Sequence, residues 1–99
     1  MPDNPLQPIE ALDPRLMKMM QDTRDLALGE GALPRKYKFL IAMCLDAADG
    51  ASDGVASLAR AAMRAGATKE EVGEALRVAQ YICGAGAIYT AAKGIKETL

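Results

Sequence analysis

The sequence predicts an all-α protein, a single-domain bundle of about five helices. The chain has 99 residues, the size of one domain, and 51% of them are hydrophobic while only 4% are aromatic. Alanine alone accounts for 19 residues, and the β-branched and aromatic side chains that favour strands are scarce. Because the apolar residues also recur at helical spacing, we expect closely packed helices rather than a β-sandwich or a disordered chain.

The chain is expected to divide into an N-terminal arm, residues 1–12, and a helical domain, residues 13–99. Proline lacks the N–H that a helix interior needs, so the arm's prolines oppose a helix there. These prolines are Pro2, Pro5 and Pro8.

The first helix is predicted over residues 14–28. Asp13 can cap it, and Pro14 suits its first position. Gly29 and Gly31 end it. Its apolar face is formed by Leu16, Met17, Met20 and Ala27.

Pro34 opens the second helix, and Gly50 follows its end. The third helix begins near Ser52 or Asp53 and stops at Gly66. Both carry apolar residues at the spacing of a core-facing helix. In the second helix these are Tyr37, Leu40, Ile41, Cys44, Leu45 and Ala48; in the third they are Val55, Leu58, Ala59 and Ala62.

A capping box opens the fourth helix, with Thr68 as the N-cap and Glu71 three residues later. Gly84 and Gly86 interrupt the helix and indicate a kink or a close crossing, because a lone GxG without a preceding strand is weak evidence for a phosphate loop. One side of the fourth helix carries Val72, Ala75, Leu76, Ala79, Ile82 and Cys83, and a fifth helix follows with Ile88, Ala91, Ala92, Ile95 and Leu99 at helical spacing.

Charge and composition argue against several classes of function. Twelve basic residues against thirteen acidic ones leave no excess for nucleic-acid binding. No apolar stretch is long enough for a membrane helix, and the N-terminus does not resemble a signal peptide, so we expect a cytoplasmic protein. Because the chain has no histidine, Ser/His/Asp and Cys/His catalysis and histidine-dependent metal sites are excluded within it. No cofactor is predicted.

Cys44 and Cys83 are interpreted as small core residues, since no CxxC motif is present and free cysteine is usually buried. Cys44 could act as a reactive thiol only if a pocket exposed it. Tyr81 and Tyr89 flank the glycine pair, and their hydroxyls suit an interface better than a ligand pocket.

Three carboxylates, Asp46, Asp49 and Asp53, surround the turn between the second and third helices. Grouped carboxylates could supply a general base or bind a hard cation. The alternative is that Asp53 caps the third helix while the other two face water. The candidate pocket is therefore Cys44, Asp46, Asp53 and Tyr81, with no catalytic residue and no metal assigned.

The stretches LPRKYKFLIAMCLDAADG and LARAAMRAGATKEEVGEALRVAQYICGAG resemble the carboxymuconolactone decarboxylase family, which includes the alkylhydroperoxidase D-like proteins. The most specific part is residues 62–79, where a glycine turn and a capping box join two helices. The resemblance covers roughly residues 4–97. It implies an alkylhydroperoxidase D-like helical bundle assembled as a trimer or hexamer.

The resemblance also implies a site of the form E…CxxCxxxH in the peroxidase-like members. Counting back from Gly66, the histidine position falls at Leu58, the cysteines at Ala51 and Gly54, and the glutamate at Phe39. None of the four residues matches, so the family's thiol peroxidase mechanism lacks its thiolates and its proton relay. The decarboxylase members' histidine is missing as well.

Two hypotheses follow. In the first, the chain is an oligomeric scaffold or small-ligand binder without the family's peroxidase or decarboxylase chemistry. In the second, it is an enzyme with a rebuilt site, using Asp46, Asp53 or Cys44 on a small acid or peroxide. In both, a homo-oligomer is expected because a small core supplies little stability and association buries further apolar surface.

Overall fold

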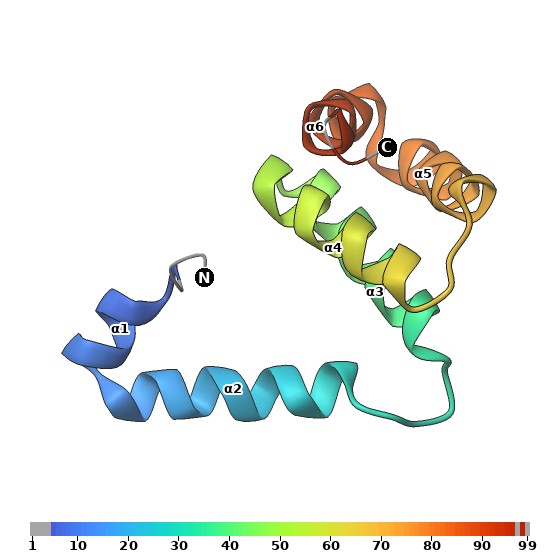
Figure 1. The fold of residues 1–99 in the computed structure, drawn as a ribbon. Coiled ribbons are helices and arrows are strands. Elements are labelled where there is room, and N and C mark those ends of the chain that lie inside the picture. The colour runs from blue at the N-terminus through green and yellow to red at the C-terminus, as the bar shows by residue number, and fades with distance from the viewer. Residues whose placement is uncertain (1–4, 97, 99) are drawn as a thin grey trace.

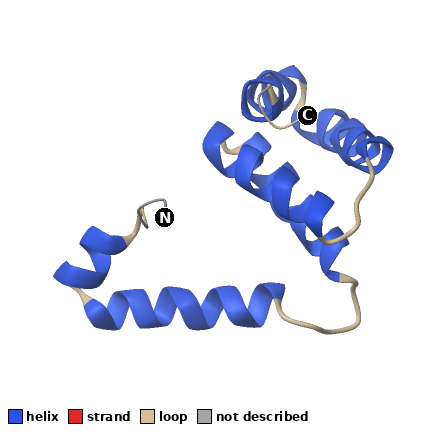
Figure 2. Cartoon of the chain, viewed as in Figure 1, coloured by secondary structure: helices blue, strands red, loops and turns tan. Residues whose placement is uncertain are grey.

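A computed structural model of the chain describes residues 5–96 and 98. It contains six α-helices and, over those residues, no strand (Figures 1 and 2). The predicted all-α architecture is confirmed. The helices are α1 (Gln7–Leu12), α2 (Pro14–Leu28), α3 (Arg35–Ala48), α4 (Ser52–Arg64), α5 (Lys69–Cys83) and α6 (Ala85–Ile95).

The core lies among α3, α4, α5 and α6, which form a compact bundle (Figure 1). Helices α3 and α4 pack along each other most extensively, and α6 lies against both α4 and α5. The largest fully buried side chains are Met43, Val55 and Val72, one from each of three helices. Phe39 and Leu40 also belong to the core, and the other members of the buried cluster are alanines, which allow close packing: Ala47, Ala59, Ala62, Ala67, Ala87 and Ala91.

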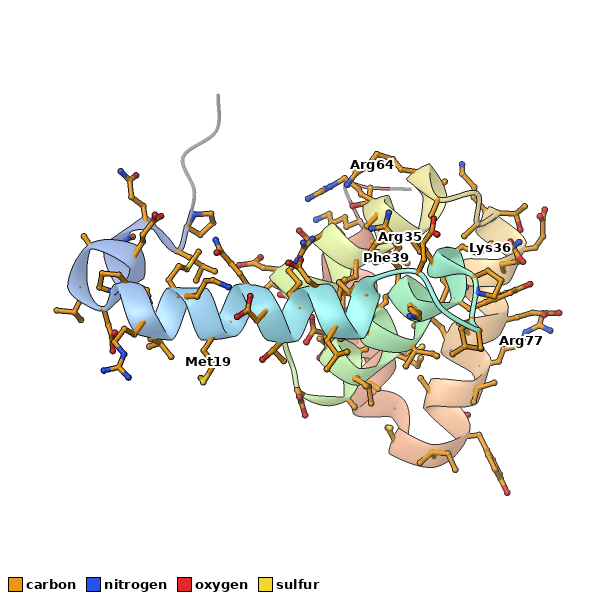
Figure 3. All side chains as sticks on the ribbon, turned by 90° about the horizontal axis from the view of Figure 1, so that it is seen from below. Met19, Arg35, Lys36, Phe39, Arg64 and Arg77 are labelled. Atoms are coloured by element: carbon orange, nitrogen blue, oxygen red, sulfur yellow. The ribbon has the colours of Figure 1, made fainter. Side chains whose placement is uncertain are left out.

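Helices α1 and α2 form an arm that extends away from the bundle (Figure 1). Within α2 only Met17 is buried, and it lies outside the main core, so the predicted apolar face of this helix is largely exposed. Figure 3 shows Met19 projecting from α2 into open space. The arm is tied to the bundle by polar contacts, in which Arg35 donates to the carbonyl of Leu28 and Lys38 to that of Gly29.

The expectation that prolines would prevent a helix before residue 13 is wrong for residues 7–12, which form α1. Pro8 lies in the first turn of this helix, where the N–H groups have no intrahelical partner, so its missing N–H costs nothing. Pro2 lies outside the described residues.

Most helix boundaries follow the predicted caps. The Asp13 side chain accepts from the Leu16 N–H at 3.0 Å, and Thr68 and Glu71 form the complete capping box of α5. Gly84, with φ of +82°, separates α5 from α6 in a conformation that disfavours other residues. Asp53 does not cap α4; the N-cap is Ala51 and Asp53 lies in the first turn, where its charge still favours the helix dipole.

The buried face of α3 differs from the predicted one. Phe39, Leu40, Met43 and Ala47 face the core. Tyr37, Ile41 and Leu45 are exposed, with 62% of Leu45 accessible. Helix α3 carries two apolar stripes, and periodicity alone does not say which one a neighbouring helix covers. On α5, Ile82 and Cys83 are likewise exposed rather than buried.

The last helix ends at Ile95, and Leu99, predicted to belong to it, lies outside the described residues. Helix α6 approaches α4 closely at Gly94, where an added Cβ would meet the Ser52 carbonyl oxygen at 2.5 Å and Val55 Cβ at 2.8 Å. Glycine is needed there by packing rather than by backbone conformation. Across the described part of the chain, no helix is both long and apolar enough to cross a bilayer.

Candidate functional site

An apolar groove of about 640 Å³ runs between α3 and α5. Leu40 and Ala79 form its buried floor. Its sides are large hydrophobic residues that remain accessible, among them Val78 at 67% and Ile82 at 74%. The lining residues are Tyr37, Leu40, Ile41, Cys44, Leu45, Glu71, Glu74, Ala75, Val78, Ala79, Ile82 and Cys83.

Both cysteines line this groove, and both are free thiols. Cys44 is half-buried, and its Sγ donates to the Ala75 carbonyl oxygen at 3.4 Å. Burial raises the pKa of the Cys44 thiol, and the proximity of Cys83 raises it further. The thiolate is the reactive form, so a raised pKa disfavours nucleophilic attack by Cys44. Cys83 is exposed, so its interpretation as a core residue is wrong.

An ion pair joins α3 to α5 at one end of the groove. Lys36 Nζ lies 3.0 Å from Glu71 Oε2, and Glu71 also accepts from the backbone N–H of Thr68 at 2.9 Å. The Thr68 N–H and the Lys36 ammonium lower the pKa of Glu71, and the same carboxylate raises the pKa of Lys36. One side chain therefore completes the cap of α5 and fastens that helix to α3.

The structure separates the residues of the predicted pocket. Cys44 lines the apolar groove, whereas Asp53 lines a different, polar hollow between α4 and α6. Asp46 lies against Gly54 at the start of α4. Tyr81 is 82% exposed on α5 and is not among the residues lining the groove. Within the described ranges, no cluster of three cysteine or acidic side chains has a geometry that could hold a metal ion.

The resemblance places catalytic side chains at positions 39, 51, 54 and 58. Position 39 lies on α3, and the other three lie on α4 or at its N-cap. Phe39 is buried, with the Arg35 guanidinium 5.3 Å from its ring centroid (Figure 3). Leu58 packs against the buried cluster. Ala51 is the N-cap of α4, and Gly54 makes room for the Asp46 carboxylate. These positions supply apolar and small side chains, which offer neither a thiolate nor a proton relay.

The sequence profile of the carboxymuconolactone decarboxylase family matches residues 14–97. The chain belongs to this family. The resemblance drawn from the glycine turn and the capping box is thereby confirmed. The match begins at the first residue of α2.

A solved structure supports the same assignment. The apo crystal structure of a carboxymuconolactone decarboxylase family protein from Legionella pneumophila superposes with a TM-score of 0.85 at 30% sequence identity. The match covers 92% of this chain and 81% of the Legionella chain. A search of the curated proteins finds no match. Family and fold are therefore established by agreement of sequence and structure.

The sequence does not predict the groove as a site, although several of its lining residues belong to predicted apolar helix faces. These residues are Tyr37, Ile41, Leu45 and Ile82. An apolar face of a helix is expected to pack in the core rather than to line an accessible groove. The second apolar stripe on α3 is the feature that could have indicated an additional apolar surface.

Proposed function

We propose that this family member is an oligomeric small-ligand binder that lacks the family's thiol peroxidase and decarboxylase chemistry. The observation that carries the proposal is the groove between α3 and α5, whose walls are accessible hydrophobic side chains and whose volume of about 640 Å³ suits a small molecule. Ligand sites are typically concave, mostly apolar and lined by a few polar groups. Here those groups are Tyr37, Cys44, Glu71 and Glu74.

Association of copies is part of this proposal. Tyr81 and Tyr89 are also exposed, and the α2 arm exposes Leu16, Met19, Met20 and Leu26. Exposed large hydrophobic side chains that gather on a surface are typical of interaction sites. A second copy laid over the groove would shield a bound ligand from water, and a trimer or hexamer in the cytoplasm is the assembly we expect.

The residues at the family's catalytic positions support the absence of its chemistry. Ala51 and Gly54 have no sulfur, and Leu58 and Phe39 cannot transfer a proton. Of the two thiols that line the groove, the half-buried one, Cys44, has a raised pKa. We expect no hydroperoxide turnover with a dithiol reductant; turnover that is lost in Cys44→Ser would contradict this part of the proposal.

Binding is tested with a neutral fluorescent probe, N-phenyl-1-naphthylamine. We expect saturable binding that Val78→Glu weakens by about tenfold, because a charge must be desolvated in the groove. Val78→Ile, at the same position, retains the apolar surface and serves as the matched control. Equal binding to both variants would place the probe elsewhere and overturn the assignment of the groove.

An enzyme with a rebuilt site is the second candidate. The observation in its favour is that Asp53 lines a polar, solvent-connected hollow with basic and hydroxyl side chains. Asp46 and Cys44 do not line that hollow, so of the three residues named for a rebuilt site it holds Asp53 alone. Turnover of a small acid that disappears in Asp53→Asn and persists in Cys44→Ser would establish this alternative.

A further inference from the structure

A second hollow, of about 560 Å³, lies between α4 and α6 and differs from the groove in chemistry. Its polar lining is three cations, one carboxylate and two hydroxyls: Arg60, Lys93, Lys96, Asp53, Ser52 and Ser57. From this juxtaposition we infer that the hollow is a binding site for a small molecule that carries a phosphate dianion. This site is distinct from the apolar groove and does not depend on the function proposed for it.

The cations of the hollow are available to a ligand. The two ion pairs found among the described residues are Lys18–Asp22 and Lys36–Glu71, and neither involves the hollow. Arg60 Nη1 donates to Thr98 Oγ1 at 3.2 Å. A guanidinium has five N–H donors in a planar fork, so this contact leaves most of them free to bind phosphate oxygens.

The charge balance favours a dianion. Among the described lining residues, three cationic side chains face one carboxylate, Asp53, an excess of two formal positive charges at neutral pH. A phosphate monoester carries about −1.5 to −2 at pH 7 and three strong acceptor oxygens. The hydroxyls of Ser52 and Ser57 add neutral donors that can satisfy the remaining oxygens.

Close packing holds the two halves of the hollow together. Gly94 of α6 fits against the Ser52 carbonyl and Val55 of α4, where a side chain would clash. Lys93 and Lys96 flank this contact and are thereby brought beside α4. The site is thus built on two packed helices rather than on a loop.

The hollow also differs in position from the family's catalytic residues. Asp53, Ser57 and Arg60 recur at i, i+4 and i+7, which places them on one side of α4. Positions 51, 54 and 58 recur at i, i+3 and i+7 and lie on a different side of the helix. Phosphate binding here is therefore separate from the location of the family's redox motif.

The test is a titration of the full chain with inorganic phosphate, followed by amide chemical shifts at constant ionic strength. We expect saturable shifts confined to residues 52–60 and 93–96. The double variant Arg60→Gln/Lys93→Gln should weaken binding by about tenfold or more, because it removes two charge-assisted hydrogen bonds. Arg77→Gln/Lys69→Gln is the matched control, since it removes the same charges from α5; Arg77 points outward there (Figure 3).

A variant that binds phosphate more tightly distinguishes a change in the site from a loss of folded structure. Asp53→Asn removes the opposing charge and should tighten phosphate binding several-fold, a result that unfolding cannot produce. Acetate should bind much more weakly than phosphate. Shifts that rise linearly without saturation, an equal loss in the control variant, or acetate binding as tight as phosphate would overturn the assignment. Neutral-probe binding in the groove should be unchanged in Arg60→Gln/Lys93→Gln.

Discussion

Cys44 shows how the surroundings of one side chain determine its chemistry. It lines an open groove, yet its thiol is half-buried and donates to the Ala75 carbonyl. Burial stabilises the protonated form, so its pKa lies above the ordinary value of 9.0. The fact that Cys44 lines a groove is therefore not sufficient to make it a nucleophile.

The pH dependence of alkylation tests this conclusion. In Cys83→Ser, where Cys44 is the remaining cysteine, we expect the rate of iodoacetamide modification to keep rising with pH beyond 9.0. Mass spectrometry of the labelled peptide gives the rate. A plateau at or below neutral pH would show a lowered pKa and would restore Cys44 as a candidate nucleophile.

Two glycines at helical positions have opposite predicted effects. Gly94→Ala places a methyl group against the Ser52 carbonyl and Val55, so we expect a loss of about 1–3 kcal/mol from overpacking. Gly73 is helical and an added Cβ meets nothing within 4 Å, so Gly73→Ala should stabilise the protein by about 0.5–1 kcal/mol. Urea denaturation followed by circular dichroism measures both. Equal effects at the two positions would contradict the close crossing of α4 and α6.

At the scale of the element, the start of α5 combines a cap with a tertiary contact. Thr68 accepts from the Glu71 N–H at 3.1 Å, while the Glu71 carboxylate binds both the Thr68 N–H and Lys36. Thr68→Ala should cost about 1 kcal/mol of unfolding free energy, the usual value for a lost N-cap. Thermal denaturation at neutral pH measures it, and an unchanged midpoint would contradict the capping role.

The ion-paired carboxylate of Glu71 predicts that the free energy of unfolding decreases at acidic pH. The pKa of Glu71 is lowered from 4.5 in the folded chain, so its contribution is present above the unfolded value and is lost as pH falls through the folded one. Glu71→Gln should therefore be less stable than the wild type at neutral pH and should lose less stability on acidification. Glu70→Gln, which removes a carboxylate without an ion pair or hydrogen bond among the described residues, is the control.

At the scale of the whole molecule, the main feature is apolar surface that one copy does not cover. The arm of α1 and α2 leaves the bundle, and the outer faces of α3 and α5 present Ile41, Leu45 and Ile82. We expect the protein to elute well above 10.5 kDa, as a trimer or hexamer. Light scattering at micromolar concentration measures the mass, and a monomer would refute the expectation. Leu45→Glu should reduce the assembled fraction if α3 forms the contact.

The positions of the long helices can be predicted from the residues alone, because caps and breakers act locally. Asp13, the pair Thr68 and Glu71, and Gly84 each fix a boundary through contacts within a few residues. The glycine turn and capping box also identified the family. The short helix α1 is not predicted, because proline disfavours the interior of a helix. Pro8 lies in the first turn, where proline is tolerated.

Which apolar stripe of a helix is buried depends on the packing between helices. The packing of α3 against α4 covers Met43 and Ala47 and leaves Tyr37 and Leu45 outside, although both stripes have helical spacing. The candidate sites depend on the same packing, since the groove and the polar hollow each draw residues from two helices distant in sequence. Periodicity reports the faces of one helix, whereas burial depends on the neighbouring helix that each face meets.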